Sequence, residues 1–495
     1  MRRIGILALI FHLSICSFGQ ILEVSPISLG AAFSIPKAET IESVSKVSSG
    51  SSMVLATQSD NIFLRPLSVE TGFPIRLLSI RSNETKKVRK HILRGDSLFC
   101  MIKSVEKNNS AIFESVIYTV HNDQLAEAER HQVGFTKPLG RKNAQPIFFE
   151  ASENGKVSVV ARQFPFVKEK KANLFVEITH YPTSNTTSHT IPLPFESDDI
   201  EITGITISNN GLVFIGAKTG IKLNSPFLRK HLLYSFNQDS LELHEFDLSV
   251  DKLFIDRMAI KNMDNQIHVL ALFSSDPFKQ GQAAGFTFFK LNSQGAEVEE
   301  KFIHMFDSKT ILDFNSEAKP GQGIEDLTIQ AVLPNEENSW AIMDQRYLDQ
   351  VCTTDPRTGI ITCTDQYHFD GILLKSLPDS EKSHFIGRDQ VDYNTAGDYM
   401  GQQTFVSDGK LIVLYNDHMK NTSIQADRIM NNPGRSILRY VYVNEENKLV
   451  SDVYQGLDDF VLLTKVPGYQ INGKVVLLLS NGKDFKLGTI DTSRL

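Results

Sequence analysis

Asp408–Tyr415, with the sequence Asp-Gly-Lys-Leu-Ile-Val-Leu-Tyr, is the stretch that decides the fold. An Asp-Gly pair supplies the positive φ angles that a tight hairpin turn needs, and the apolar run behind it has the length of one strand. Asn472–Leu479, with the sequence Asn-Gly-Lys-Val-Val-Leu-Leu-Leu, repeats the pattern near the C-terminus. Both stretches predict strands that follow tight turns.

The same unit recurs along the whole chain, and helical periodicity is almost absent. Apolar strands are expected to begin near residues 53, 97, 156, 211, 266, 339, 410 and 474. After most of them comes a second β-prone arm that is often aromatic, as in 115–120, 232–236, 285–289 and 437–442. A degenerate repeat of about 60 residues predicts one four-stranded sheet per repeat, arranged radially. We therefore expect an all-β β-propeller of seven or eight blades, whose first and last segments share a blade. A β-sandwich array is the alternative.

The N-terminus has the features of an export signal. Arg2 and Arg3 precede an apolar stretch that is too short to span a bilayer, and Ser17 and Gly19 stand at the −3 and −1 positions of a cut before Gln20. We expect residues 1–19 to be a signal peptide and the mature chain to be periplasmic, surface-bound or extracellular. Lipidation of Cys16 is the alternative to cleavage before Gln20.

The composition is that of a globular protein. The chain has 495 residues, of which 22% are charged and 41% hydrophobic, and its formal net charge is −7. A mildly acidic chain with no dominant basic region is a poor nucleic-acid binder. No Pro-rich or Ser-rich linker divides the sequence, so residues 20–495 are expected to form a single β-propeller-like domain without a transmembrane segment.

The C-terminal hundred residues carry a resemblance to a known group of proteins. The stretches 405–417, 436–441 and 473–488 resemble the ends of exported β-propeller-like proteins of unassigned function from Bacteroidota-type bacteria. The resemblance implies an envelope or secreted location and no chemistry, because it brings no catalytic residues with it.

Two cysteines flank a turn. Cys352 and Cys363 enclose Asp355-Pro356-Arg357-Thr358-Gly359, and folding a hairpin about this turn places them opposite each other. In an oxidising compartment they are expected to form a disulfide. Metal ligation together with His368 is the rival use, but the spacing fits no common zinc pattern.

Candidate ligand-binding residues cluster in the same repeat. Trp340, the only tryptophan, lies near Tyr347, Tyr367 and His368, and together they are a candidate stacking platform for a sugar or peptide. The competing interpretation is that these aromatic residues belong to the core of a blade.

A loop further on is a candidate cation site. Asp392, Asn394 and Asp398 offer oxygen ligands at alternate positions, with Gly397 at the turn, which suits calcium. Ala396 occupies a ligand position and Gln403 stands where a bidentate glutamate belongs, so an ordinary polar loop is the simpler interpretation. No other cofactor is indicated.

The usual catalytic signatures are missing from the sequence. It contains no Gly-x-Ser-x-Gly, no phosphate-binding loop and no His-Glu-x-x-His. We therefore expect a non-enzymatic binding or scaffold protein whose partner, another envelope protein, is held on rim loops at 276–285 and 319–324. The alternative is an envelope hydrolase or lyase whose acids converge from several blades. A calcium-stabilised adhesin is a third candidate.

Overall fold

A computed structural model of the chain describes residues 27–495, apart from gaps at 47–50, 69–75, 84–85, 106–110, 122–123, 134–145, 165–169, 184, 223–228, 249, 251–252, 264–265, 277, 279–280, 293–296, 336–337, 379–381, 394–396, 445, 455–456 and 458. The expected signal peptide, with Cys16, lies outside the described residues, as does Asn394.

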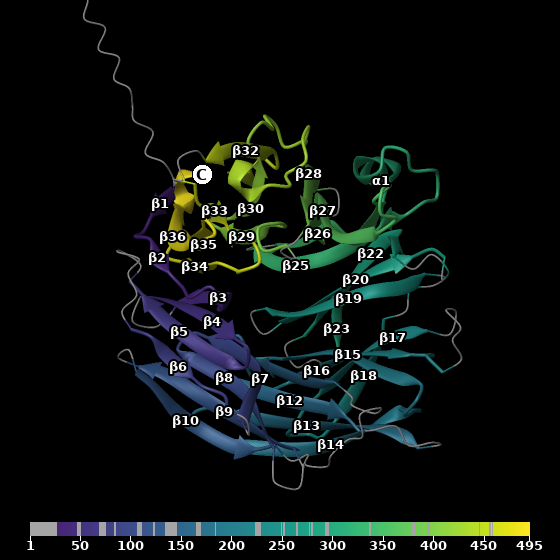
Figure 1. Ribbon diagram of the computed structural model, residues 1–495. Helices are drawn as coiled ribbons and strands as arrows, with labels where there is room; N and C mark the ends of the chain where they lie inside the picture. Colours follow the sequence, from purple (N-terminus) through teal and green to yellow (C-terminus); the bar gives the residue numbers. More distant parts are fainter. Residues whose placement is uncertain are drawn as a thin grey trace, which may run out of the picture.

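The described chain forms a ring of antiparallel sheets. Figure 1 shows them following one another around a central axis, from purple through teal to yellow, with the C-terminus beside β1. The described residues form eight blades, seven of four strands and one larger closing sheet. The prediction of a β-propeller with seven or eight blades is confirmed, and the number of blades is eight.

Blades 1 to 4 are regular four-stranded meanders. Blade 1 contains β3 (Thr40–Lys46), β4 (Ser52–Gln58), β5 (Asn61–Leu67) and β6 (Leu78–Ile80). Blade 2 contains β7 (Lys86–Arg94), β8 (Ser97–Val105), β9 (Ala111–His121) and β10 (Gln124–Gln132). Blade 3 contains β11 (Ile147–Ala151), β12 (Val157–Gln163), β13 (Lys171–His180) and β14 (Asn185–Glu196). Blade 4 contains β15 (Ile200–Ile207), β16 (Val213–Thr219), β17 (Lys230–Phe236) and β18 (Leu243–Asp247).

Blades 5 to 7 carry additional elements between their strands. Blade 5 contains β19 (Phe254–Met263), β20 (Gln266–Ser274), β22 (Gly285–Leu291) and β23 (Val298–Met305). Blade 6 contains β25 (Leu327–Asn335), β26 (Asn338–Thr354), β27 (Ile361–Leu377) and β28 (Ser383–Asp392). Blade 7 contains β29 (Gln403–Ser407), β30 (Lys410–His418), β31 (Ser436–Val443) and β32 (Leu449–Tyr454). The additional elements are β21 (Gln282–Ala283), β24 (Ile324–Glu325), the helix α1 (Ser308–Phe314) and the 3₁₀ turn η2 (Pro433–Arg435).

Blade 8 closes the ring with both ends of the described chain. Its C-terminal part is β33 (Val461–Leu462), β34 (Tyr469–Ile471), β35 (Lys474–Ser480), β36 (Asp484–Asp491) and the 3₁₀ turn η3 (Thr492–Arg494). The N-terminal strands β1 (Ile27–Leu29) and β2 (Phe33–Ser34) both pair with β36. The first and last segments therefore share a blade, as expected from the sequence.

The first strand of each blade lies towards the axis, because first strands of neighbouring blades contact one another. The eight apolar runs of the sequence are the second strands, from β4 to β35. Blades on either side cover both faces of these strands, which is why their sequences are apolar without interruption. The core consequently lies between blades; one large cluster fills the space between blades 3 and 4, and another joins blades 4 and 5.

The two faces of the ring differ. Because successive strands are antiparallel, one face carries the second-to-third strand connections and the connections between blades. We call this the long-loop face, since blades 5 to 7 extend it with β21, β24, α1, the far half of the β26–β27 hairpin and residues 419–435. No helix within the described residues is long and apolar enough to cross a membrane.

Candidate functional site

The β26–β27 hairpin is the longest feature of the long-loop face. Each of its strands has 17 residues, whereas the neighbouring strands of blades 5 and 7 have seven to nine. Cys352 lies opposite Cys363 in the register, and the two sulfur atoms are joined at 2.10 Å. The far half of the hairpin is largely exposed, so the disulfide ties its strands together where the core does not.

The foot of this hairpin aligns several polar side chains on one face. Gln345 is opposite Asp370, and Tyr347 is opposite His368. On the next strand, Asp389 is opposite Asp370. Cross-strand partners share a face and alternate residues return to it, so all five side chains lie together. The rings of Tyr347 and His368 stack 4.3 Å apart.

These side chains form part of a pocket of about 420 Å³, the hairpin-foot pocket. One wall is apolar, because Phe314 of α1 meets Phe385 of β28 edge to face at 4.9 Å. A Cβ atom at Gly371 would stand 2.8 Å from both rings, so glycine is needed for this approach. A second wall is residues 425–430, which bridge in parallel to β28 at Gly387 and Gln390.

The floor of the pocket is acidic, and its carboxyl groups are partly desolvated. Burial, together with the neighbouring charge of Asp389, raises the pKa of Asp370 to about 6. Burial also raises the pKa of Asp389. The Tyr347 hydroxyl donates a hydrogen bond to Asp370, whose Oδ1 is buried with no hydrogen-bond partner among the described residues. The floor therefore lacks a partner for one carboxylate oxygen.

A buried ion pair beside the pocket links the strands that carry its residues. Arg388 donates to Asp344 at 2.8 Å, and both side chains are fully buried. Arg346 contacts the same carboxylate at 2.9 Å, and Thr328 donates to its other oxygen at 3.0 Å. Because Asp344 is on β26 and Arg388 on β28, the pair fixes the strand that carries Asp389 relative to the hairpin.

The structure separates the four aromatic and histidine candidates of the sequence. Tyr347 and His368 both line the hairpin-foot pocket. Trp340 is 5% exposed and lies in the core between blades 6 and 7. Tyr367 points to the opposite face of the hairpin, where it packs against Phe369. Of the four candidates, only Tyr347 and His368 therefore lie together in one pocket.

The candidate calcium loop uses its two described acids in protein contacts. Asp392 accepts a hydrogen bond from the backbone of Gly397 at 2.6 Å, and Asp398 pairs with Lys465 at 3.0 Å. Within the described part of the chain, no group of three or more His, Cys, Asp or Glu side chains is arranged to hold a metal ion.

The two rim loops expected to hold a partner lie side by side. Residues 282–283 pair with residues 324–325 as the small sheet β21–β24. Ala283 and Ile324 enter the core between blades 5 and 6, whereas Phe278 near the start of the first loop is 70% exposed. Both loops are therefore anchored in the core, and the first also presents an exposed apolar residue.

Sequence reasoning missed the acid pair of the pocket. Acids that are adjacent in the chain, such as Glu325-Asp326, are easy to find, but neighbours on a strand point to opposite faces. Asp370 and Asp389 are far apart in sequence and meet only through the strand register. The signal that was available is the cysteine pair, whose register places Tyr347 opposite His368 and Gln345 opposite Asp370.

No protein-family model and no curated protein sequence matches the chain. Solved structures similar to it include the Dos1 propeller, at 10% identity over 94% of this chain and 96% of that one, with a TM-score of 0.44. An oligogalacturonate lyase in complex with manganese is 8% identical over 95% and 98%, with a TM-score of 0.42. The β-propeller domain of the trilobed protease from Pyrococcus furiosus is 11% identical over 83% and 95%, with a TM-score of 0.35. At these identities the likeness concerns the fold alone.

Proposed function

We propose that the protein is a non-enzymatic binding or scaffold protein that holds a protein partner on the long-loop face of blades 5 to 7, with a lysine or arginine side chain of the partner in the hairpin-foot pocket. The observation that carries the proposal is the pocket itself, which combines an apolar wall with an acidic floor.

The charges of the pocket favour a cation. Arg388 also lines it and stabilises the charged form of Asp370, but it is paired with the buried Asp344, and burial still raises the pKa of Asp370. Asp370 and Asp389 stand opposite each other, and their mutual repulsion is relieved when a cation enters. The aliphatic stem of a lysine or arginine fits against Phe314, and its charged end meets the carboxylates.

The surroundings of the pocket suit a protein partner. Several large apolar side chains are exposed on connections of the long-loop face, namely Phe278, Leu312, Leu348, Ile360, Ile361 and Ile429. Ile429 lines the pocket itself, and exposed apolar side chains on one face of a protein are typical of interaction surfaces. The disulfide of the hairpin suits an oxidising compartment, as does the export signal expected from the sequence, and we take the partner to be another envelope or secreted protein.

The direct test compares two peptides that differ in one charge. Acetyl-Gly-Lys-Gly-amide and its norleucine counterpart have nearly the same stem, so calorimetric titration of both isolates the contribution of the ammonium group. We expect saturable binding of the lysine peptide only, weakened at least tenfold in the double variant Asp370→Asn, Asp389→Asn. Asp365→Asn, on the opposite face of the same hairpin, is the matched control. Equal binding of the two peptides would overturn the proposal.

The second candidate is a hydrolase or lyase, and the acid pair is the observation that favours it. An Asp370 with a pKa of about 6 is suited to donate a proton near neutral pH, while Asp389 acts as base. Both acids come from blade 6, not from several blades. Release of reducing ends from polysaccharides, with a pH profile that inflects near 6 and an activity that is lost in Asp370→Asn, would establish this activity. If no polysaccharide is cleaved, the acid pair has only the binding role proposed above.

A further inference from the structure

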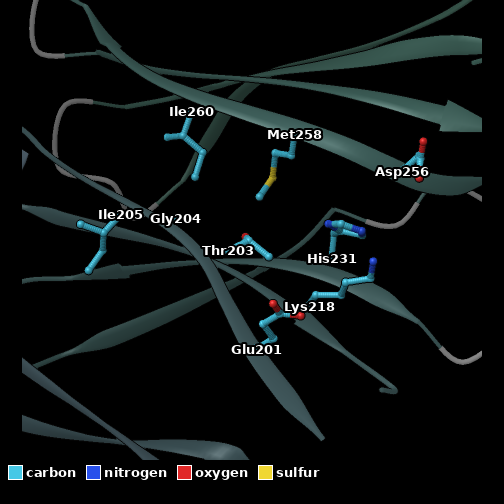
Figure 2. A pocket seen from close by; sticks show the side chains of 9 residues that line it. All are labelled: Glu201, Thr203, Gly204, Ile205, Lys218, His231, Asp256, Met258 and Ile260. Atoms are coloured by element: carbon cyan, nitrogen blue, oxygen red, sulfur yellow. The ribbon is translucent and has the colours of Figure 1, made fainter. Parts of the chain in front are cut away.

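A second pocket, of about 350 Å³, lies between blades 4 and 5, close to the axis of the ring and near the start of the first strand of each blade. We call it the channel-side pocket. Figure 2 shows Glu201, Lys218 and His231 on one side of it and Met258 and Ile260 on the other. It shares no residue with the hairpin-foot pocket, so a ligand of one pocket can be tested independently of the other.

The polar side of this pocket results from strand register. Glu201 on β15 is opposite Lys218 on β16, which is opposite His231 on β17. One polar row thus crosses the face of blade 4 that looks towards blade 5. Further along the same face, Phe214 and Leu233 belong to the apolar core between the two blades. The pocket therefore lies beside the apolar core, at the end of the face that carries polar side chains.

Two glycines occupy the next row, and they differ in the space around them. Gly204 is opposite Gly216. A Cβ atom at Gly216 would stand 3.0 Å from Met258 and from Thr203, so that position is filled by its neighbours. A Cβ atom at Gly204 would meet nothing within 4 Å, and its φ lies outside the left-handed region. The space above Gly204 is therefore available to a ligand and also to a larger side chain.

His231 is the buried group that this pocket leaves without a partner. Its residue is 7% exposed, and neither ring nitrogen has a hydrogen-bond partner among the described residues. Burial and the nearby Lys218 lower the pKa of His231 to about 4, against the opposing effect of Asp256. The ring is thus neutral at neutral pH, with one nitrogen that donates and one that accepts. Buried polar groups in native proteins are normally paired, so an unpaired imidazole beside a pocket points to a missing partner.

Two β-bulges bring further polar groups to the site. Thr203 is the extra residue of a bulge on β15, and Asp256 is the extra residue of a bulge on β19. Bulges re-aim side chains, and equivalent bulges recur on β3, β7 and β25, so the geometry of the repeat itself brings these two groups to the pocket. The Asp256 carboxylate is held in place by the backbone N–H of Gly281 at 2.9 Å. The acid is therefore positioned before any ligand arrives.

The combined chemistry selects the class of ligand. The carboxylates of Glu201 and Asp256 accept hydrogen bonds, Lys218 donates, and the imidazole and the Thr203 hydroxyl do both. Two carboxylates against one ammonium group disfavour an anion. Hydroxyl groups donate and accept at once, so a ligand with several of them matches all five groups, while its C–H faces contact the apolar side of the pocket. We propose that the channel-side pocket binds an uncharged, polyhydroxylated ligand of about the size of a single sugar.

The test uses four neutral sugars and two charged ones. D-glucose, D-galactose, D-mannose and D-xylose are compared with D-galacturonate and D-glucosamine by saturation-transfer NMR, and the ring ¹⁵N signals of His231 report the site. We expect at least one neutral sugar to bind saturably and to shift those signals. The absence of saturable binding for all four, or tighter binding of either charged sugar than of any neutral one, would overturn the proposal.

Variants at Gly204 locate the binding. Gly204→Leu fills the open space and should weaken the sugar at least tenfold, whereas Gly204→Ala leaves most of the volume and should change affinity less than twofold. Lys218→Met removes a donor from the half-exposed part of the row and should also weaken binding, which keeps the test decisive if the leucine variant folds poorly. Binding that survives both Gly204→Leu and Lys218→Met would place the sugar elsewhere and overturn the assignment.

Discussion

The hairpin-foot pocket and the channel-side pocket are built in different ways. The first depends on additions to the propeller: a helix between blades, a lengthened hairpin and a connection that bridges to β28. The second is made from regular strands of blades 4 and 5, modified by two bulges and a pair of glycines. A single substitution can disturb one of the added elements that form the hairpin-foot pocket without unfolding the propeller. The channel-side pocket is formed by strands of the propeller itself, so it should persist for as long as the ring stays folded. Damage to the added elements should therefore affect the first pocket and spare the second.

Asp344→Ala should have the largest effect. It leaves Arg388 buried and unpaired, which typically costs about 3–5 kcal/mol. We expect urea unfolding to show a loss of this size and binding of the lysine peptide to disappear, while the channel-side pocket keeps its ligand in the folded fraction. Glu299→Ala, an exposed carboxylate on β23, is the control and should cost less than about 0.5 kcal/mol. Equal losses in both variants would mean that the buried pair does not support the fold.

Replacing both Cys352 and Cys363 by serine should have the next largest effect. The disulfide closes a short loop, and removing it releases chain entropy in the unfolded state worth about 2–3 kcal/mol. Trypsin cleavage after the exposed Arg357 should become faster, because the hairpin end then frays. Urea unfolding under non-oxidising conditions and a digestion time course measure the two effects. An unchanged cleavage rate would show that the strand pairing alone holds the hairpin.

The repeat of strands could be predicted from the sequence, whereas the two pockets could not. Strands such as β30 and β35 are covered on both faces, so their apolar runs are visible without knowledge of their neighbours. First strands such as β15 face the axis with polar and apolar residues mixed, and their bulges have no sequence signature as clear as Asp-Gly. The pairing of Tyr347 with His368 is implied by the cysteine register, but the approach of Phe314 depends on how α1 packs, which no local pattern specifies.

Phe314→Ala should have a smaller effect on stability and a clear one on binding. The side chain is half-buried and packs edge to face on Phe385, so its loss should cost about 2 kcal/mol, below the range for a fully buried phenylalanine. The lysine peptide should bind several-fold more weakly, because the wall for its aliphatic stem is gone. Leu312→Ala on the same helix is 46% exposed and is the control. Peptide titration of both variants separates the wall of the pocket from the helix that carries it.

Asp370→Asn should have the smallest effect, and one that depends on pH. The pKa of Asp370 is about 6 in the folded protein and 3.8 for an ordinary aspartate, so the folded state holds the proton more tightly than the unfolded state. Stability from this group is then complete below about pH 4 and is lost as pH rises to about 6. The wild-type protein should therefore lose about 1–2 kcal/mol relative to Asp370→Asn over this interval, measured by urea unfolding at several pH values.

Asp355→Asn provides a contrast of opposite sign. Backbone N–H groups of Arg357 and Thr358 lower the pKa of Asp355, so its contribution to stability is lost as pH falls. A flat difference for Asp370→Asn over the same pH range would mean that the floor of the hairpin-foot pocket is solvated like an ordinary surface. The channel-side pocket would then be the one of the two pockets whose polar groups are desolvated, because its buried imidazole does not depend on an added wall.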